Sequence, residues 1–125
     1  MKDDIDTAVQ RIAPYVHRTP VLTCKAINAM AETNIYFKCE NLQKVGAFKF
    51  RGACNTVFSL TDEEASQGVG THSSGNHAAA VALAAKLRGI RAHGVMPETA
   101  PEIKKKAVIG YGAEITFCKP TLTSR

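Results

Sequence analysis

The first group in this sequence that could do chemistry is a lysine set between two aromatic residues. Lys49 stands between Phe48 and Phe50 at the predicted start of a helix. The residues three, four and seven positions further along, on the same side of that helix, are all small: Gly52, Ala53 and Thr56. We expect an amine in such apolar surroundings to resist protonation, because desolvation penalises its charged form. A neutral amine is a nucleophile that forms a Schiff base with an aldehyde. The alternative is an ordinary lysine whose ammonium reaches solvent.

A turn rich in hydroxyl and amide groups is the second chemical feature. Residues 71–77 read Thr-His-Ser-Ser-Gly-Asn-His and lie between a predicted strand and an alanine-rich helix. Such a turn directs side-chain and backbone donors to one point, and the positive end of the helix dipole reinforces them. The pattern therefore predicts a cradle for an anion. The alternative is a simple helix N-cap, in which Ser74 or Asn76 accepts hydrogen bonds from first-turn amides.

Several other kinds of site are excluded by the spacing of their residues. Gly68 and Gly70 do not extend to the GxGxxG pattern of dinucleotide-binding proteins, and no GxxxxGK[ST] phosphate loop is present. His72 and His77 lack the HExxH pattern of zinc enzymes, and Ser74 lacks the GxSxG pattern of hydrolases. The four cysteines are too far apart for a CxxC motif. We therefore expect no metal ligands in this chain.

Composition favours a globular domain that is soluble and cytoplasmic. The 125 residues are 45% apolar and 22% charged, close to the average for globular proteins, and the chain starts without the apolar stretch of a signal peptide. The net charge of +5 permits an anionic partner. A run of lysines at 104–106 predicts a solvated helix face. A nucleic-acid-binding domain resting on this run is the weaker alternative, because no aromatic residues are interleaved with it.

The first half of the sequence is expected to contain three helices and one strand. Apolar residues at helical spacing predict a first helix that ends at Pro14. Strict alternation predicts a half-buried strand over residues 35–40. A second helix follows, with apolar positions from 50 to 58. Thr61 and Glu64 are placed to form the capping box of a short third helix.

From residue 69 onward, short strands alternate with helices. The expected elements are strands over 69–72, 90–96 and 113–118, a helix over 76–88 that Gly89 ends, and a helix up to residue 109. Thr99 and Glu102 are predicted to form the capping box of this last helix, with Pro101 in its first turn. Strands that alternate with helices of about a dozen residues are typical of a parallel sheet, so the sequence predicts the α/β fold class.

Taken together, the lysine and the hydroxyl-rich turn resemble a known family. The sequence is similar to the pyridoxal-phosphate enzymes of the tryptophan-synthase-β-like fold, specifically the serine racemase and serine/threonine dehydratase family. The resemblance runs from Ile5 to the end, in the family's order. The matching stretches are 18–22 (RTPVL), 38–43 (KCENLQ), 46–53 (GAFKFRGA), 72–77 (HSSGNH), 97–101 (PETAP) and 110–114 (GYGAE).

This resemblance implies that pyridoxal 5'-phosphate is the cofactor. Lys49 would hold it through a Schiff base, and Phe48 would pack against its ring. Asn76 would form a hydrogen bond with the phenolic oxygen of the ring. The protonated cofactor would supply the electron sink, and the protein would supply orientation and proton donors.

The resemblance also implies how an amino-acid substrate is held. Its carboxylate would lie against the turn, contacting Ser73, Ser74, Asn76 and His77, which is the anion that the turn is predicted to bind. In racemising members the residue matching Ser74 sits across the cofactor from the lysine. Two bases on opposite faces of one Cα explain racemisation, and loss of a β-hydroxyl from the same carbanion explains dehydration.

The implied fold is a three-layer α/β/α arrangement around a parallel sheet, represented here by the small domain and part of the large one. We expect residues 1–125 to be the N-terminal part of one enzyme domain, truncated and without a second complete domain. Family members are more than twice as long, and the nine glycines include no adjacent pair like that of the loop that holds the cofactor phosphate. The isolated chain is therefore expected to be inactive.

Two departures limit what is carried over from the family. Ala78 and Ala79 follow His77 where many members have Gly-Gln, so contacts beyond His77 are not assigned. Cys24 and Lys25 stand where some members have a serine pair, so a nucleotide effector site that uses the pair is not assumed.

The sequence thus predicts racemisation, dehydration or both, with serine or threonine as the small-molecule substrate. We expect a homodimer when the enzyme is complete, and neither nucleic acid nor membrane as a partner. The alternative is a non-catalytic remnant, or a regulatory partner of a full-length homologue.

Overall fold

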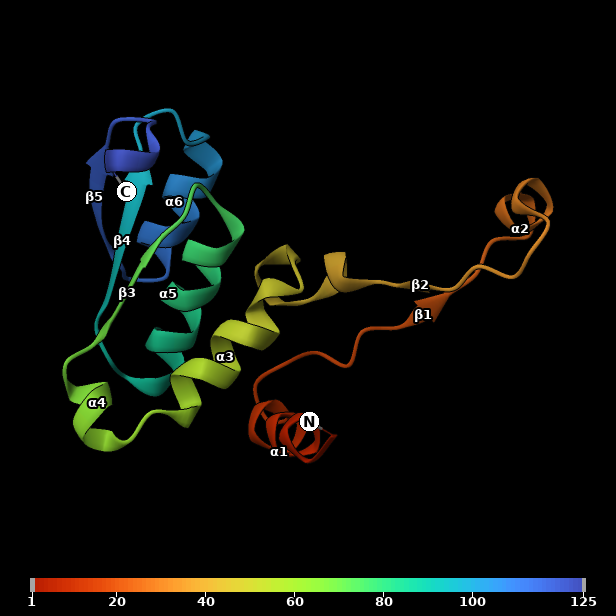
Figure 1. The fold of residues 1–125 in the computed structure, drawn as a ribbon, viewed down its shortest axis with the longest axis horizontal. Helices are drawn as coiled ribbons and strands as arrows, with labels where there is room; N and C mark the ends of the chain where they lie inside the picture. Colours follow the sequence, from red (N-terminus) through yellow and green to blue (C-terminus); the bar gives the residue numbers. More distant parts are fainter. Residues whose placement is uncertain (1, 125) are drawn as a thin grey trace.

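A parallel sheet of three strands, in the order β3-β4-β5, forms one side of the carboxyl-terminal half of the chain (Figure 1). The computed structural model describes residues 2–124. The strands are β3 (Val69–His72), β4 (Ala92–Pro97) and β5 (Glu114–Cys118). Each lies within two residues of the range that its hydrophobic pattern predicts. The predicted α/β class with a parallel sheet is therefore confirmed.

Two helices cover one face of this sheet. Helix α5 (Asn76–Arg88) packs on β3 and β4, and α6 (Glu102–Gly110) packs on β5. Six alanines and a valine of α5 are buried, because alanine favours helix and its small side chain allows close approach. Gly89, with a φ of +74°, ends α5 as predicted. No helix within the described part of the chain is long and apolar enough to cross a membrane.

The opposite face of the sheet carries polar side chains. His93 of β4 lies in register between Gly70 and Glu114, and the side chains of His93, Glu114 and Thr116 are exposed. Met96 of β4 is instead fully buried among α5 and α6 residues. Of the three layers that the family resemblance implies, residues 2–124 thus show the sheet and the helix layer on one face.

A second group of helices packs against α5. Phe50 of α3 (Lys49–Ser59) is fully buried in one cluster with Ala80 of α5. Helix α1 (Lys2–Ile12) adds Ile12 to the same cluster. Helix α3 buries its predicted apolar side. The predicted apolar side of α1 is only partly buried, because Ile12 is buried whereas Ile5 and Val9 are exposed.

An arm extends away from these helices (Figure 1). It contains β1 (Val21–Leu22), which pairs antiparallel with β2 (Phe37–Lys38), and α2 (Lys25–Ala31), which has no buried residue. The expected half-buried strand over residues 35–40 is therefore wrong in extent. Only two of its residues pair, and Phe37 is exposed, because no core lies beneath the arm within the described residues.

The two predicted capping boxes have different outcomes. Thr61 and Glu64 cap α4 (Asp62–Ser66) reciprocally, as predicted. The box at Thr99 is wrong, because α6 begins one residue after Pro101 and no side chain caps it. The ring of Pro101 fixes φ near the helical value, and its carbonyl accepts from the amides three and four residues further on.

Three short 3-10 turns complete the described chain: η1 (Glu40–Leu42), η2 (Lys44–Gly46) and η3 (Leu122–Ser124). All four cysteines are free. Cys54 is buried in the core, whereas Cys39 is half-buried.

We expect Gly68→Ala to destabilise the fold. Gly68 has a φ of +79°, and a Cβ there would lie 2.9 Å from the carbonyl oxygen of Arg91. Backbone strain of this kind costs about 1–3 kcal/mol, so the free energy of unfolding in urea should fall by about that much. Gly110→Ala is the control, because its Cβ would meet nothing within 4 Å and its φ is not positive. Equal stability of the two variants would contradict this assignment.

Candidate functional site

The hydroxyl-rich turn lies at the carboxyl end of β3, where the chain enters α5. The amide of Ser73 donates to the carbonyl oxygen of Val95 at 3.0 Å. The hydroxyl of Ser73 accepts from the amide of Gly75 at 3.2 Å, so the turn is held at both ends. Ser74 is exposed at its tip. The carboxyl edge of a parallel sheet is where open α/β proteins bind ligands, and the turn is placed at that edge.

The first turn of α5 keeps its amide donors free of a side-chain cap. The N-cap residue is Gly75, and no side chain accepts a hydrogen bond from the first turn. The alternative in which Ser74 or Asn76 acts as a simple cap is therefore wrong. Asn76 and His77, the first residues of α5, are exposed. First-turn amides have no acceptor within a helix, so they can serve an external anion.

Lys49 lies at the first position of α3, and its side chain is exposed. Its Nζ is 5.2 Å from the centre of the Phe48 ring, and Phe48 is itself 61% exposed. The expectation of an apolar pocket around this amine is wrong for the described part of the chain. Ala53 is buried, but Gly52 and Thr56 are exposed, so small size on this side of the helix does not mark a buried surface.

Packing between α3 and α5 holds the lysine and the turn in one region. Phe50 follows Lys49 directly, and it shares a buried cluster with Ala80, one turn into α5. The amino-terminal ends of α3 and α5 point to the same side of the molecule (Figure 1). The structure thus brings the two sequence motifs to one side of the fold, although residues 50–70 separate them in the chain.

A cavity of about 410 Å³ opens between α3, β3 and the start of α5. Its lining includes Thr56 of α3 together with Thr71 and His77 from the region of the turn. Ligand cavities commonly measure about 300–1,000 Å³, so its size suits a small molecule. Lys49 and Ser74 do not line this cavity.

Lys104 is a residue of this region that sequence reasoning missed. Its ammonium donates a hydrogen bond to Oδ1 of Asn76. The prediction that the lysine run is a solvated face is wrong at Lys104, which is half-buried, and at Lys105, whose side chain is 14% exposed. The sequence did not single it out. Lys104 stands four residues before Val108, which is fully buried, but Lys105 stands four residues before Ile109, which is exposed.

An ion pair ties the start of α3 to the segments before it. The guanidinium of Arg51 donates to both carboxylate oxygens of Glu40 at 2.8 Å, and the hydroxyl of Thr19 donates to Glu40 at 2.5 Å. The hydrogen bond from Arg51 is the main reason why the pKa of Glu40 falls to about 2. Because Arg51 is two residues from Lys49, this pair orients the first turn of α3.

The side-chain amide of Gln43 performs a similar role for the preceding loop. Gln43 is buried, and its amide accepts from the backbone N–H of His17 at 2.9 Å and donates to the His17 carbonyl at 2.8 Å. It also accepts from the amide of Lys44 at 3.0 Å. These bonds fix the loop that leads into Phe48 and Lys49.

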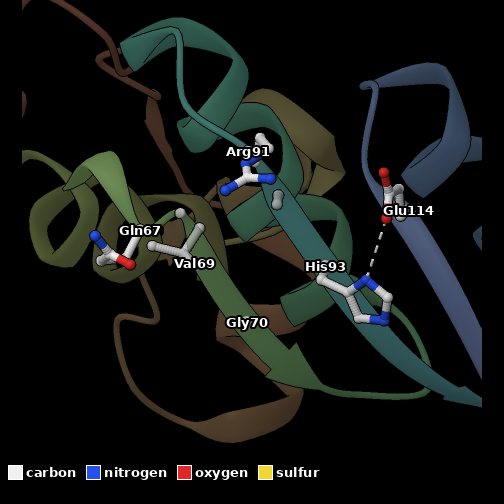
Figure 2. A pocket seen from close by; sticks show the side chains of 8 residues that line it. Gln67, Val69, Gly70, Arg91, His93 and Glu114 are labelled. Atoms are coloured by element: carbon white, nitrogen blue, oxygen red, sulfur yellow. Dashed lines mark ion pairs between the residues drawn. The ribbon is translucent and has the colours of Figure 1, made fainter. Parts of the chain in front are cut away.

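A second hollow, of about 340 Å³, lies at the amino-terminal ends of the strands (Figure 2). Its lining includes Arg91, His93 and Glu114, and Nδ1 of His93 is 3.6 Å from the Glu114 carboxylate. The turn lies at the carboxyl end of β3, at the opposite end of the strands from this hollow, so the hollow is separate from the candidate site. Among the described residues, no group of three or more His, Cys, Asp or Glu could hold a metal ion.

Comparison with protein families shows which family the chain belongs to. A family described as "Pyridoxal-phosphate dependent enzyme" matches residues 12–125. The chain belongs to this family. Its lysine and turn therefore occur within a family whose cofactor is an aldehyde that carries a phosphate.

Curated relatives within the pyridoxal-phosphate family are closely similar. The chain is 56% identical over 122 residues to the serine racemase of Dictyostelium discoideum, with 98% of this chain and 38% of that protein covered. It is 50% identical over 123 residues to a β-hydroxyaspartate dehydratase of Paracoccus denitrificans, with 98% of this chain and 39% of that protein covered. The chain thus spans less than two-fifths of the length of these relatives.

The solved structure of maize serine racemase has the same fold. It superposes with a TM-score of 0.95 at 57% identity, covering 98% of this chain and 37% of that chain. The expected fold of the pyridoxal-phosphate family, incomplete relative to its members, is thereby confirmed.

We expect the ion pair of Glu40 to make stability depend on pH. Because its pKa is about 2 in the folded chain, against an ordinary value of 4.5, its contribution is fully present above about pH 4.5. The contribution is lost as the pH falls from there towards 2. Hydrogen bonds to charged groups contribute about 1.5–3 kcal/mol, so Glu40→Gln should lower the free energy of unfolding by about that much at pH 7.

Urea denaturation at several pH values tests this prediction. The gap between wild type and Glu40→Gln should narrow as the pH approaches 2. The exposed Glu98→Gln serves as control and should follow the wild-type curve. A gap that stays constant from pH 7 to pH 2 would show that the Glu40 charge does not stabilise the fold.

Proposed function

We propose that this chain is part of a pyridoxal-phosphate enzyme that racemises or dehydrates serine, threonine or a closely related hydroxy amino acid. The observation that carries the proposal is the packing of α3 on α5, which places Lys49 and the turn of residues 73–77 on one side of the fold. The names of the relatives, serine racemase and β-hydroxyaspartate dehydratase, support the reaction class.

The residues present fit the cofactor. An exposed primary amine at Lys49 is accessible to an aldehyde, and the exposed ring of Phe48 beside it offers a flat apolar surface. Asn76, at the start of α5, offers a side-chain amide to the phenolic oxygen. When bound, the cofactor supplies an electron sink for the charge that develops at the substrate Cα.

The turn would bind the carboxylate of the amino-acid substrate. Ser73 and Ser74 supply hydroxyl groups. Asn76 and His77 supply backbone N–H groups that no side chain caps, at the positive end of the α5 dipole. A carboxylate held there positions the substrate Cα, because the carboxylate carbon is bonded directly to it.

The proton steps would be shared between two side chains. The amine of Lys49 removes or returns a proton on one face of the substrate Cα, and the hydroxyl of Ser74 acts on the other. Two bases on opposite faces invert the configuration, because the proton leaves on one side and returns on the other. If the substrate loses its β-hydroxyl before a proton returns to the Cα, the result is dehydration at the same site.

The whole protein is required for this chemistry in our proposal. Residues 1–125 would form part of one longer catalytic domain, since they span 38% of the Dictyostelium racemase. Lys49 is exposed in this chain, so the apolar surroundings that favour its neutral amine would come from the remaining part of the protein. The chain alone would accordingly bind the cofactor weakly and turn over no substrate.

A regulatory partner of a full-length homologue is the second candidate function. The exposed apolar side chains of the arm favour it, because Met30 is 86% and Tyr36 is 70% exposed, and such surfaces commonly contact other chains. The same surface supports a homodimer of the complete enzyme. A cytoplasmic location accords with four free cysteines, since cytosolic thiols stay reduced.

Reductive trapping tests the role of Lys49. Pyridoxal phosphate added to the complete protein should produce a Schiff-base absorbance, and borohydride should fix one adduct on Lys49, located by peptide mass mapping. Lys49→Ala should abolish the adduct and both activities. Adducts spread over exposed lysines such as Lys106, with none at Lys49, would refute the enzyme proposal. Trapping in the complete protein only, and not in residues 1–125, would support the need for the remaining part.

Ser74→Ala tests the second base. In the complete enzyme we expect loss of serine racemisation by about 10²–10⁴-fold, the usual contribution of a general acid or base. The Schiff-base absorbance should remain, and so should part of the L-serine dehydration, which is measured as pyruvate release. Racemisation is measured by chiral chromatography of serine. Ser59→Ala, at the far end of α3, is the control. Undiminished interconversion of the serine enantiomers in Ser74→Ala would disprove the assignment.

A further inference from the structure

We propose that Lys104 is a positioning residue of the site, which sets the orientation of the Asn76 side-chain amide. The ammonium of Lys104 donates a hydrogen bond to Oδ1 of Asn76. Lys104 lies on α6 and Asn76 at the start of α5, so the contact links two elements. The inference rests on the proposed function, in which Asn76 faces the phenolic oxygen of the cofactor.

The lysine is held in place along its whole side chain. Its Cγ, Cδ and Cε lie 3.6–3.8 Å from the position that a Cβ of Gly75 would occupy, so the aliphatic stem passes closely over the turn. The side chain is half-buried. Its backbone amide donates to the carbonyl of Pro101 at 2.9 Å, and Val108, on the same face of α6, is fully buried. Lys104 therefore reaches Asn76 from a fixed base.

An ammonium allows only one orientation of the amide. It carries three donors and no acceptor, so the oxygen of Asn76 must face Lys104. The amide nitrogen then points away from Lys104 and is free to donate. A donor is what an ionised phenolic oxygen needs, whereas a reversed amide would present its own oxygen and repel the charge. Lys104 thus selects the orientation in which Asn76 stabilises the ionised cofactor oxygen.

The other two lysines of the run contact different groups. Lys105 donates to the carboxylate of Glu102 and to the carbonyl of Glu98, both at 2.8 Å. Lys106 is exposed. The three residues carry the same charge on the same helix, so Lys106→Met is a matched control for Lys104→Met. Lys104→Met keeps an unbranched apolar stem over Gly75 and removes the donor together with its charge.

The first test is spectroscopic and uses the complete protein loaded with pyridoxal phosphate. The absorbance of the bound cofactor is recorded against pH. In Lys104→Met we expect the midpoint of the transition in which the cofactor oxygen loses its proton to rise by about one pH unit, since the Asn76 amide is then no longer held with its donor towards the ionised oxygen. Lys106→Met should retain the wild-type midpoint. A midpoint in Lys104→Met equal to that of Lys106→Met would overturn the proposal.

A double-mutant cycle with Asn76→Ala tests whether Lys104 acts through Asn76. If it does, adding Lys104→Met to Asn76→Ala should produce no further change in the midpoint. A purely structural effect, or a direct effect of the Lys104 charge on the cofactor, would instead persist in the Asn76→Ala background. Such persistence would overturn the proposal.

A third measurement separates failure of this inference from failure of the proposed function. In the cofactor-free complete protein labelled with ¹⁵N-asparagine, the side-chain amide signals of Asn76 are assigned by their loss in Asn76→Ala. They should shift in Lys104→Met and stay in place in Lys106→Met. Unshifted signals in Lys104→Met would overturn the contact, whether or not borohydride labels Lys49. Absence of a Lys49 adduct alongside a shift would refute the proposed function and uphold the positioning of Asn76.

Discussion

Close packing of α3 against α5 is the contact on which the other features of this chain depend. Helix α5 presents alanines at nearly every buried position, and these small side chains let Phe50 and Val57 of α3 enter the cluster that they share. A larger residue at Ala80 or Ala84 would separate the helices. Because Lys49 and Asn76 are the first residues of these helices, their relative position depends on this contact more than on any local geometry.

Polar contacts then complete what helix packing begins. Arg51 and Glu40 fix the first turn of α3 against the preceding segment, and Lys104 orients an amide at the first turn of α5. In both places a cation donates a hydrogen bond to a carboxylate or amide oxygen near the start of a helix. Each contact joins two different elements, η1 to α3 in the first case and α6 to α5 in the second.

Much of the fold could be predicted from local patterns. The alanine-rich stretch indicates α5, Gly89 marks its end, and the Thr61–Glu64 spacing indicates the cap of α4. These features depend on backbone propensity and on contacts within a few residues. The strand over residues 35–40 was overestimated for the converse reason. Alternation predicts a strand only where a partner surface exists, and the arm has no such surface among the described residues.

The sequence by itself determined the order of helices and strands from residue 49 onward, the two chemical motifs and their family, because these follow from residue type and short spacing. It did not predict β1 and α2 of the arm. Only the tertiary structure decided where the side chains of those motifs lie. Lys49 is exposed although its neighbours are small, and Lys104 binds Asn76 although it stands in a run of lysines. Exposure and hydrogen bonding between distant elements are set by how helices and strands pack together, and packing is not encoded in the spacing of any one segment.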